Sequence, residues 1–138
     1  MQPDPARLAE AWMRTSSEDF DHASSTASRF PRLACFSAQQ ASEKALKAVL
    51  VRVAGDVPRS HLSTHLVAEA HHLGLKLPGE VIEAAQGLDK YYGATRYPDA
   101  VGGLAPADVY HADDAALALA QAERVLVYAR QFFADEGP

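Results

Sequence analysis

The chain has little cysteine and no long apolar run. Cys35 is the one cysteine among 138 residues, so no internal disulfide can form, and a reducing compartment is expected. Residues 1–14 lack the apolar stretch of a secretory signal. No segment approaches the roughly 18 apolar residues that a membrane-spanning helix requires. These absences predict a cytoplasmic protein without a membrane segment.

An excess of positive charge is also lacking. The chain has 13 Lys and Arg against 18 Asp and Glu, which gives a formal net charge of -5. Proteins that bind nucleic acid through bulk electrostatics need clustered Lys and Arg to displace counterions. Any contact with RNA is therefore expected to be local. The sequence also has no glycine-rich phosphate loop, and no segment shows the sustained alternation of apolar and polar residues that is typical of strands.

What the chain does contain is a series of helical patterns. Helices are predicted from Ala6 to Ser28, from Pro31 to Gly55, from Ser60 as a cap to Gly74, from Pro78 to Gly93, and from near His111 onward. Residues 94–107 lose the periodicity and are predicted to form a loop. The length suits one domain over residues 1–138. The predicted fold is all-α: an up-and-down antiparallel four-helix bundle with an extra short helix, about five helices.

The segment 33–50 carries the most distinctive of these patterns. On a helix, five alanines fall in one row that lets another helix come close: Ala34, Ala38, Ala41, Ala45 and Ala48. A second sector collects larger side chains: Phe36, Gln40, Glu43, Lys44 and Lys47. Glu43 and Lys47 have the spacing of a favourable i,i+4 ion pair. From charge patterning alone, this second sector is interpreted as a solvated face.

Four segments, in the right order, resemble one family. They are Cys35–Ala48 (CFSAQQASEKALKA), Val57–His61 (VPRSH), Leu88–Asp99 (LDKYYGATRYPD) and Tyr110–Ala115 (YHADDA). Together they are similar to the HEPN domain, a small helical domain found in prokaryotes beside minimal nucleotidyltransferases. The fourth segment departs from the pattern, because a Ser or Thr cap is more usual there than His111. The resemblance implies a helical bundle that commonly dimerises and has a role in nucleotide or RNA chemistry.

A candidate ligand site lies between Tyr91 and Asp99. Arg96 could pair with a phosphate, Tyr92 or Tyr97 could stack on a base, and Asp99 could accept from a ribose hydroxyl or a base amine. Alternatively, Arg96 and Asp99 pair to lock the loop while Tyr92 continues an apolar stripe. The two interpretations, ligand binding and a structural role, hold at once if the loop crosses the polar side of the second helix. The predicted ligand-binding residues are Gln40, Lys44, Lys47, Tyr92, Arg96, Tyr97 and Asp99.

An enzymatic alternative rests on one pair of residues. Some HEPN proteins are metal-independent ribonucleases that carry an Arg, four to six residues, then a His on a late helix. No His follows Arg124 or Arg130, so that motif is missing here. Arg59 and His65 match the spacing, though they lie before and within the third helix. His61 and His65 are one helical turn apart, but they are interpreted as surface residues, and no metal or cofactor is expected.

The leading interpretation is a non-enzymatic HEPN protein. It binds a nucleotide or RNA, or a nucleotidyltransferase partner, or both, as one half of a toxin–antitoxin type pair. The second and last helices offer broad apolar arcs that end in Phe132 and Phe133. These arcs exceed what a minimal bundle buries, which predicts a homodimer.

Overall fold

The chain folds into six α-helices and two 3₁₀ turns over residues 3–136, the part that the computed structural model describes. The helices are α1 (Pro5–Thr26), α2 (Pro31–Ala54), α3 (Ser63–His72), α4 (Gly79–Gly87), α5 (Pro106–Val109) and α6 (Ala112–Glu136). The turns are η1 (Asp89–Tyr91) and η2 (Pro98–Val101). No strand occurs among the described residues, so the all-α prediction is confirmed.

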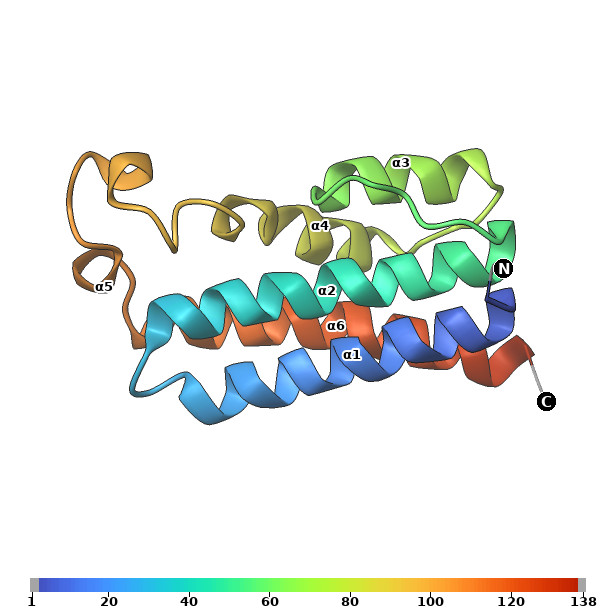
Figure 1. The fold of residues 1–138 in the computed structure, drawn as a ribbon, viewed down its shortest axis with the longest axis horizontal. Helices are drawn as coiled ribbons and strands as arrows, with labels where there is room; N and C mark the ends of the chain where they lie inside the picture. Colours follow the sequence, from blue (N-terminus) through green and yellow to red (C-terminus); the bar gives the residue numbers. More distant parts are fainter. Residues whose placement is uncertain (1–2, 137–138) are drawn as a thin grey trace.

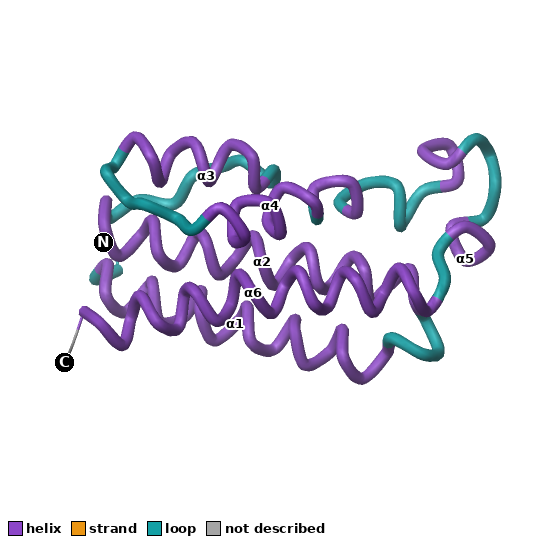
Figure 2. Tube along the Cα trace, turned by 180° about the vertical axis from the view of Figure 1, so that it is seen from behind, coloured by secondary structure: helices purple, strands orange, loops and turns teal. Residues whose placement is uncertain are grey.

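The four helices α1, α2, α4 and α6 alternate in direction along the chain and pack side by side (Figure 1). Helix α2 lies at the centre and contacts α1, α3 and α6. The short helix α3 is the predicted extra element. The stretch from η1 to α5 projects beyond α4 at one end of the bundle, and the start of α1 and the end of α6 lie at the other (Figure 2). The up-and-down bundle is therefore confirmed.

The boundaries of α2 agree with its sequence signals. Pro31 occupies the first turn, where the missing N–H costs no helical hydrogen bond. Gly55 ends the helix in the left-handed conformation, with φ of 80°, and its N–H donates to the Val51 carbonyl over 2.7 Å. This conformation favours glycine because it has no Cβ. Both ends of α2 are consequently set by local sequence.

The start of α3 was predicted wrongly. The helix begins at Ser63 rather than directly after Ser60. The Ser60 hydroxyl instead accepts from the Leu62 N–H over 3.1 Å. The first turn of α3 is capped from a distance by Asp89 of η1, which accepts from the Ser63 N–H over 2.6 Å and the Thr64 N–H over 3.1 Å. A cap supplied by a residue 25 positions away leaves no local sequence signal.

The fourth predicted helix is also shorter than its pattern. Helix α4 ends at Gly87 and gives way to η1, which changes the direction of the following side chains. Tyr91 is consequently the buried tyrosine, and Tyr92 is only half-buried. The predicted continuation of the apolar stripe to Tyr92 is therefore wrong. The predicted loop over 94–107 likewise contains η2 and the start of α5.

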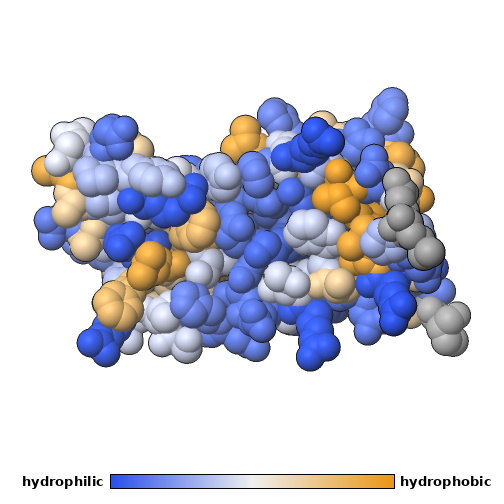
Figure 3. All heavy atoms as spheres, in the orientation of Figure 1, coloured by the Kyte–Doolittle hydropathy of each residue, from blue (hydrophilic) through white to orange (hydrophobic). Residues whose placement is uncertain are grey.

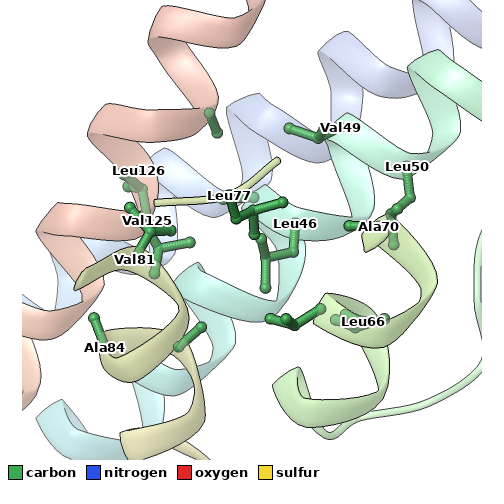
Figure 4. Close-up of a cluster of buried hydrophobic side chains, with 14 of the residues drawn as sticks. Leu46, Val49, Leu50, Leu66, Ala70, Leu77, Val81, Ala84, Val125 and Leu126 are labelled. Atoms are coloured by element: carbon green, nitrogen blue, oxygen red, sulfur yellow. The ribbon is translucent and has the colours of Figure 1, made fainter. Parts of the chain in front are cut away.

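Two apolar clusters hold the bundle together. One joins the second half of α2 to α3, α4 and α6 through Leu46, Leu66 and Leu126 (Figure 4). The other joins α1, α2 and α6 mostly through small side chains, including Ala38 and Ala118. All five alanines of the predicted α2 row are fully buried. Small side chains at this crossing explain how three long helices pack closely along their length.

We predict that Ala38→Leu destabilises the protein by about 1–3 kcal/mol, because the added atoms have no space between α2 and its neighbours. Urea unfolding followed by circular dichroism measures this change. Ala120→Leu is the matched control, since Ala120 is exposed on α6, and it should change stability by less than about 0.5 kcal/mol. Equal effects of the two substitutions would contradict the close packing of α2.

Candidate functional site

The polar side of α2 is organised by a buried carboxylate. Glu43 is 2% exposed and Lys47 is 4% exposed. Lys47 Nζ donates to Glu43 Oε2 over 3.0 Å, which confirms the predicted i,i+4 pair. Gln39 Nε2 donates to Glu43 Oε1 over 3.2 Å, and His61 Nδ1 lies 3.3 Å from Glu43 Oε2. The interpretation of this side as a solvated face is thus wrong for Glu43 and Lys47.

Two other elements cover these charges. The segment before α3 places His61 over Glu43, and the His61 carbonyl accepts from Gln39 Nε2 over 3.2 Å. Helix α1 places the ring of Trp12 5.6 Å from Lys47 Nζ. A charged helical face can be buried at acceptable cost when each charge has a partner. The sequence of α2 alone does not indicate that His61 and Trp12 cover these charges.

Further along the same side, Gln40 and Lys44 remain half-buried. Gln40 Nε2 donates to Gln39 Oε1 over 2.7 Å. Lys44 Nζ pairs with Asp19 Oδ2 of α1 over 2.6 Å, and both side chains keep roughly a quarter of their surface exposed. These side chains therefore remain within reach of a ligand.

Arg96 lies among three aromatic rings. Its Cζ atom is 4.3 Å from the ring centroid of Phe36, 4.9 Å from that of Tyr92 and 5.0 Å from that of Tyr97. Its Nε and Nη2 donate to the Tyr92 carbonyl over 2.9 and 2.5 Å. Among the described residues Arg96 makes no ion pair, and Asp99 is exposed, so the alternative of an Arg96–Asp99 lock is wrong.

A ring stack connects Arg96 to the buried carboxylate. His61 stacks on Tyr92 with ring centroids 4.9 Å apart and planes 12° from parallel. One continuous set of contacts therefore runs from Lys47 and Glu43 through His61 and Tyr92 to Arg96. We call this set of residues, together with Phe36, Gln40, Lys44 and Tyr97, the α2 strip. Hydrophilic residues gather over the middle of the face on which α2 lies (Figure 3).

The structure brings together most of the predicted ligand-binding residues. Gln40, Lys44, Lys47, Tyr92, Arg96 and Tyr97 belong to the α2 strip. Asp99 lies in η2, exposed and without a contact to the strip. Sequence reasoning missed Trp12 and Gln39, which contact Lys47 and Glu43 of the strip. The helical spacing of Gln39 to Glu43 could have identified the first polar partner, whereas the partners from other elements depend on tertiary packing.

The alternative pair Arg59 and His65 lies at a different place. Both line a cavity of about 340 Å³ between the end of α2 and α3, together with Ser60 and Glu69. Ser60 Oγ is 2.8 Å from His65 Nδ1. Arg59 and His65 are both exposed. The structure therefore places the two residues in one cavity, outside the α2 strip.

Other reactive chemistry is limited within residues 3–136. No group of three or more His, Cys, Asp or Glu side chains is arranged to hold a metal ion. Cys35 is buried, and this burial, with a smaller effect of the Asp114 carboxylate, raises the pKa of its thiol to about 12. Such a thiol is protonated at neutral pH and is a poor nucleophile. No helix in this part of the chain combines the length and apolar character needed to cross a bilayer.

The helical bundle places this chain in a known class of small all-helical proteins. A family model described as HEPN domain matches residues 9–132. The chain belongs to the HEPN family.

Two solved structures agree with this assignment. The crystal structure of TT1696 from Thermus thermophilus is 35% identical, with a TM-score of 0.81, covering 89% of this chain and 96% of that one. The crystal structure of ST0689, an archaeal HEPN homologue, is 31% identical, with a TM-score of 0.73, covering 89% of this chain and 95% of that one. A search of curated proteins found no match.

We predict that Lys47→Met destabilises the protein by about 3 kcal/mol, because it removes a partner from a buried carboxylate. Lys44→Met is the matched control on the same helix. It breaks a partly exposed pair and should cost at most about 1 kcal/mol. Urea denaturation of both variants checks the difference. Equal losses would mean that the Glu43–Lys47 pair has no special structural role.

Proposed function

We propose that this HEPN protein is a non-enzymatic module that binds a nucleotide or RNA on the α2 strip. The observation that carries the proposal is the environment of Arg96, a guanidinium held among three aromatic rings, one of which belongs to Tyr97, a residue that is 52% exposed. A held cation next to an exposed ring suits a ligand that combines an anion with a planar base.

The roles of the strip residues follow from their contacts. Arg96 Nη1 makes no hydrogen bond with residues 3–136, so it can donate to a phosphate oxygen. Tyr97 stacks on the base, and the half-buried Gln40 offers an amide to its edge. Stacking on an aromatic side chain contributes about 1–3 kcal/mol per base. The ligand is thus held mainly by a ring and one guanidinium.

Ligand binding by stacking and by the Arg96 guanidinium needs few contacts to phosphate groups. Lys44 and Lys47 already pair with Asp19 and Glu43, which leaves Arg96 as the main cation without a carboxylate partner in the strip. Binding through about one phosphate gives a shallow salt dependence, with a slope of roughly -0.7 in a log–log plot for a single strand. Such weak dependence is compatible with the net charge of -5.

We predict that Tyr97→Ala weakens nucleotide or RNA binding about tenfold, because it removes one stacking interaction. Fluorescence anisotropy with labelled RNA, at one fixed salt concentration, measures the affinity. Leu104→Ala is the matched control, since Leu104 is 59% exposed in the same projecting segment and lies outside the strip. The proposal fails if the wild-type protein binds neither mononucleotides nor RNA, or if both variants bind as tightly as the wild type.

The proposed protein partners are a second copy of this chain and a nucleotidyltransferase, as in a toxin–antitoxin type pair. Leu117 and Val127 of α6 are about half exposed, which supports an interface on that helix. Helix α6 lies behind α1 and α2 in Figure 1, and no residue of the α2 strip belongs to α6, so ligand and partner need not compete.

A ribonuclease is the second candidate function, favoured by the shared cavity of Arg59 and His65. In that reaction His65 would take the proton of the ribose 2′-hydroxyl, and Arg59 would stabilise the charge that develops on the phosphate. Our proposal predicts that the purified protein leaves RNA intact in EDTA. Cleavage that persists in EDTA and is abolished by His65→Ala would establish the enzyme instead.

A further inference from the structure

A further aromatic ring lies next to the α2 strip, at the end opposite Arg96 and Tyr97. Trp12 of α1 is partly exposed, and its ring lies beside Lys47. Trp12 also lines a shallow cavity of about 340 Å³ with Ala11, Thr15 and Lys44. The ring therefore covers the buried ammonium with one part of its surface and opens into the cavity with another.

We propose that Trp12 is a second base-stacking platform, so that the ligand is a single strand of several nucleotides lying along the strip rather than one nucleotide. This inference rests on the proposed function, because Tyr97 and Arg96 must hold one end of the strand. It assigns Trp12 and Lys44 to the other end, where Lys47 positions the Trp12 ring.

One cation at this end is within reach of a polar ligand group. The Lys47 side chain is 5% exposed, because the Glu43 carboxylate and the Trp12 ring cover its ammonium, so Lys47 positions the ring and does not contact the ligand. Lys44 is held by Asp19 at the wall of the cavity and keeps 21% of its side chain exposed. A polar group of a nucleotide whose base stacks on Trp12 can therefore accept a hydrogen bond from the Lys44 ammonium.

The distance between the platforms sets the length of the ligand. Phe36, which contacts Arg96, and Lys47, which contacts Trp12, are eleven residues apart on α2. Eleven residues make about three turns, so both side chains lie on one side of the helix and about 16 Å apart along its axis. A stacked strand advances about 3.4 Å per nucleotide, so about five nucleotides span the gap, and fewer do so when bases are splayed apart. A mononucleotide is too short to reach both rings.

The test uses the fact that Trp12 is the one tryptophan of the chain, so its fluorescence reports directly on its own site. The purified full chain is titrated with uridine monophosphate and with uridine oligonucleotides of three and six residues. We expect the hexamer to quench Trp12 and to bind at least tenfold more tightly than the monophosphate. The monophosphate should bind without quenching Trp12.

Two variants separate ligand contact from structure. Trp12→Phe keeps a ring and should retain most of the hexamer affinity. Thr15→Glu adds a negative charge at an exposed residue of the cavity and leaves the core untouched. It should weaken hexamer binding about tenfold and leave monophosphate binding and the urea midpoint unchanged. The midpoint is the readout that a purely structural effect would move.

The second platform and the proposed function would be contradicted by different results. If Tyr97→Ala weakens hexamer binding but Thr15→Glu does not, and Trp12 is not quenched, the second platform is overturned and the proposed function stands. If the monophosphate itself quenches Trp12 with a stoichiometry of two, the sites are independent and the single-strand inference is overturned. If neither ligand binds, the proposed function fails together with the inference.

Discussion

The burial of the Glu43 carboxylate is the constraint on which the rest of the site depends. An ionised carboxylate inside a protein must find partners, because the cost of removing it from water is several kcal/mol. Glu43 finds three: Gln39 and Lys47 on its own helix, and His61 from the segment before α3. Meeting this requirement brings that segment onto α2 and places the His61 ring where Tyr92 stacks on it. The position of Arg96 then follows from Tyr92.

A second carboxylate, that of Asp89, also links the segment around His61 to the segment around Tyr92. Asp89 of η1 caps the first turn of α3, so the chain just before Tyr92 is tied to the segment just after His61. The stacked pair of rings is thus flanked by two carboxylates, one buried and one at a helix end. This double attachment lets a loop-borne residue such as Arg96 keep a defined place although it lies outside the regular helices.

Much of the fold could be predicted from sequence, because its signals are local. Pro31 and Gly55 delimit α2, and its alanine row forecasts close packing. The changes at α3 and α4 could not be predicted, because Asp89 acts on residues far along the chain and η1 replaces the last turn of a regular pattern. In the site, too, local features could be predicted and contacts between distant segments could not. The spacing of Glu43 and Lys47 predicts their pair, whereas their burial depends on covers from α1 and the loop. Family resemblance grouped Tyr92, Arg96 and Tyr97, and tertiary packing joined them to α2.

We propose the α2 strip as the ligand-binding surface of this HEPN protein. The most direct test of this proposal is an amide and side-chain chemical-shift map during titration of the isotope-labelled protein with a uridine hexamer. We predict saturable shifts at Gln40, Lys44, Arg96 and Tyr97, with little change at the exposed Val127 of α6. Shifts confined to Arg59, Ser60 and His65, or no shifts at all, would contradict it.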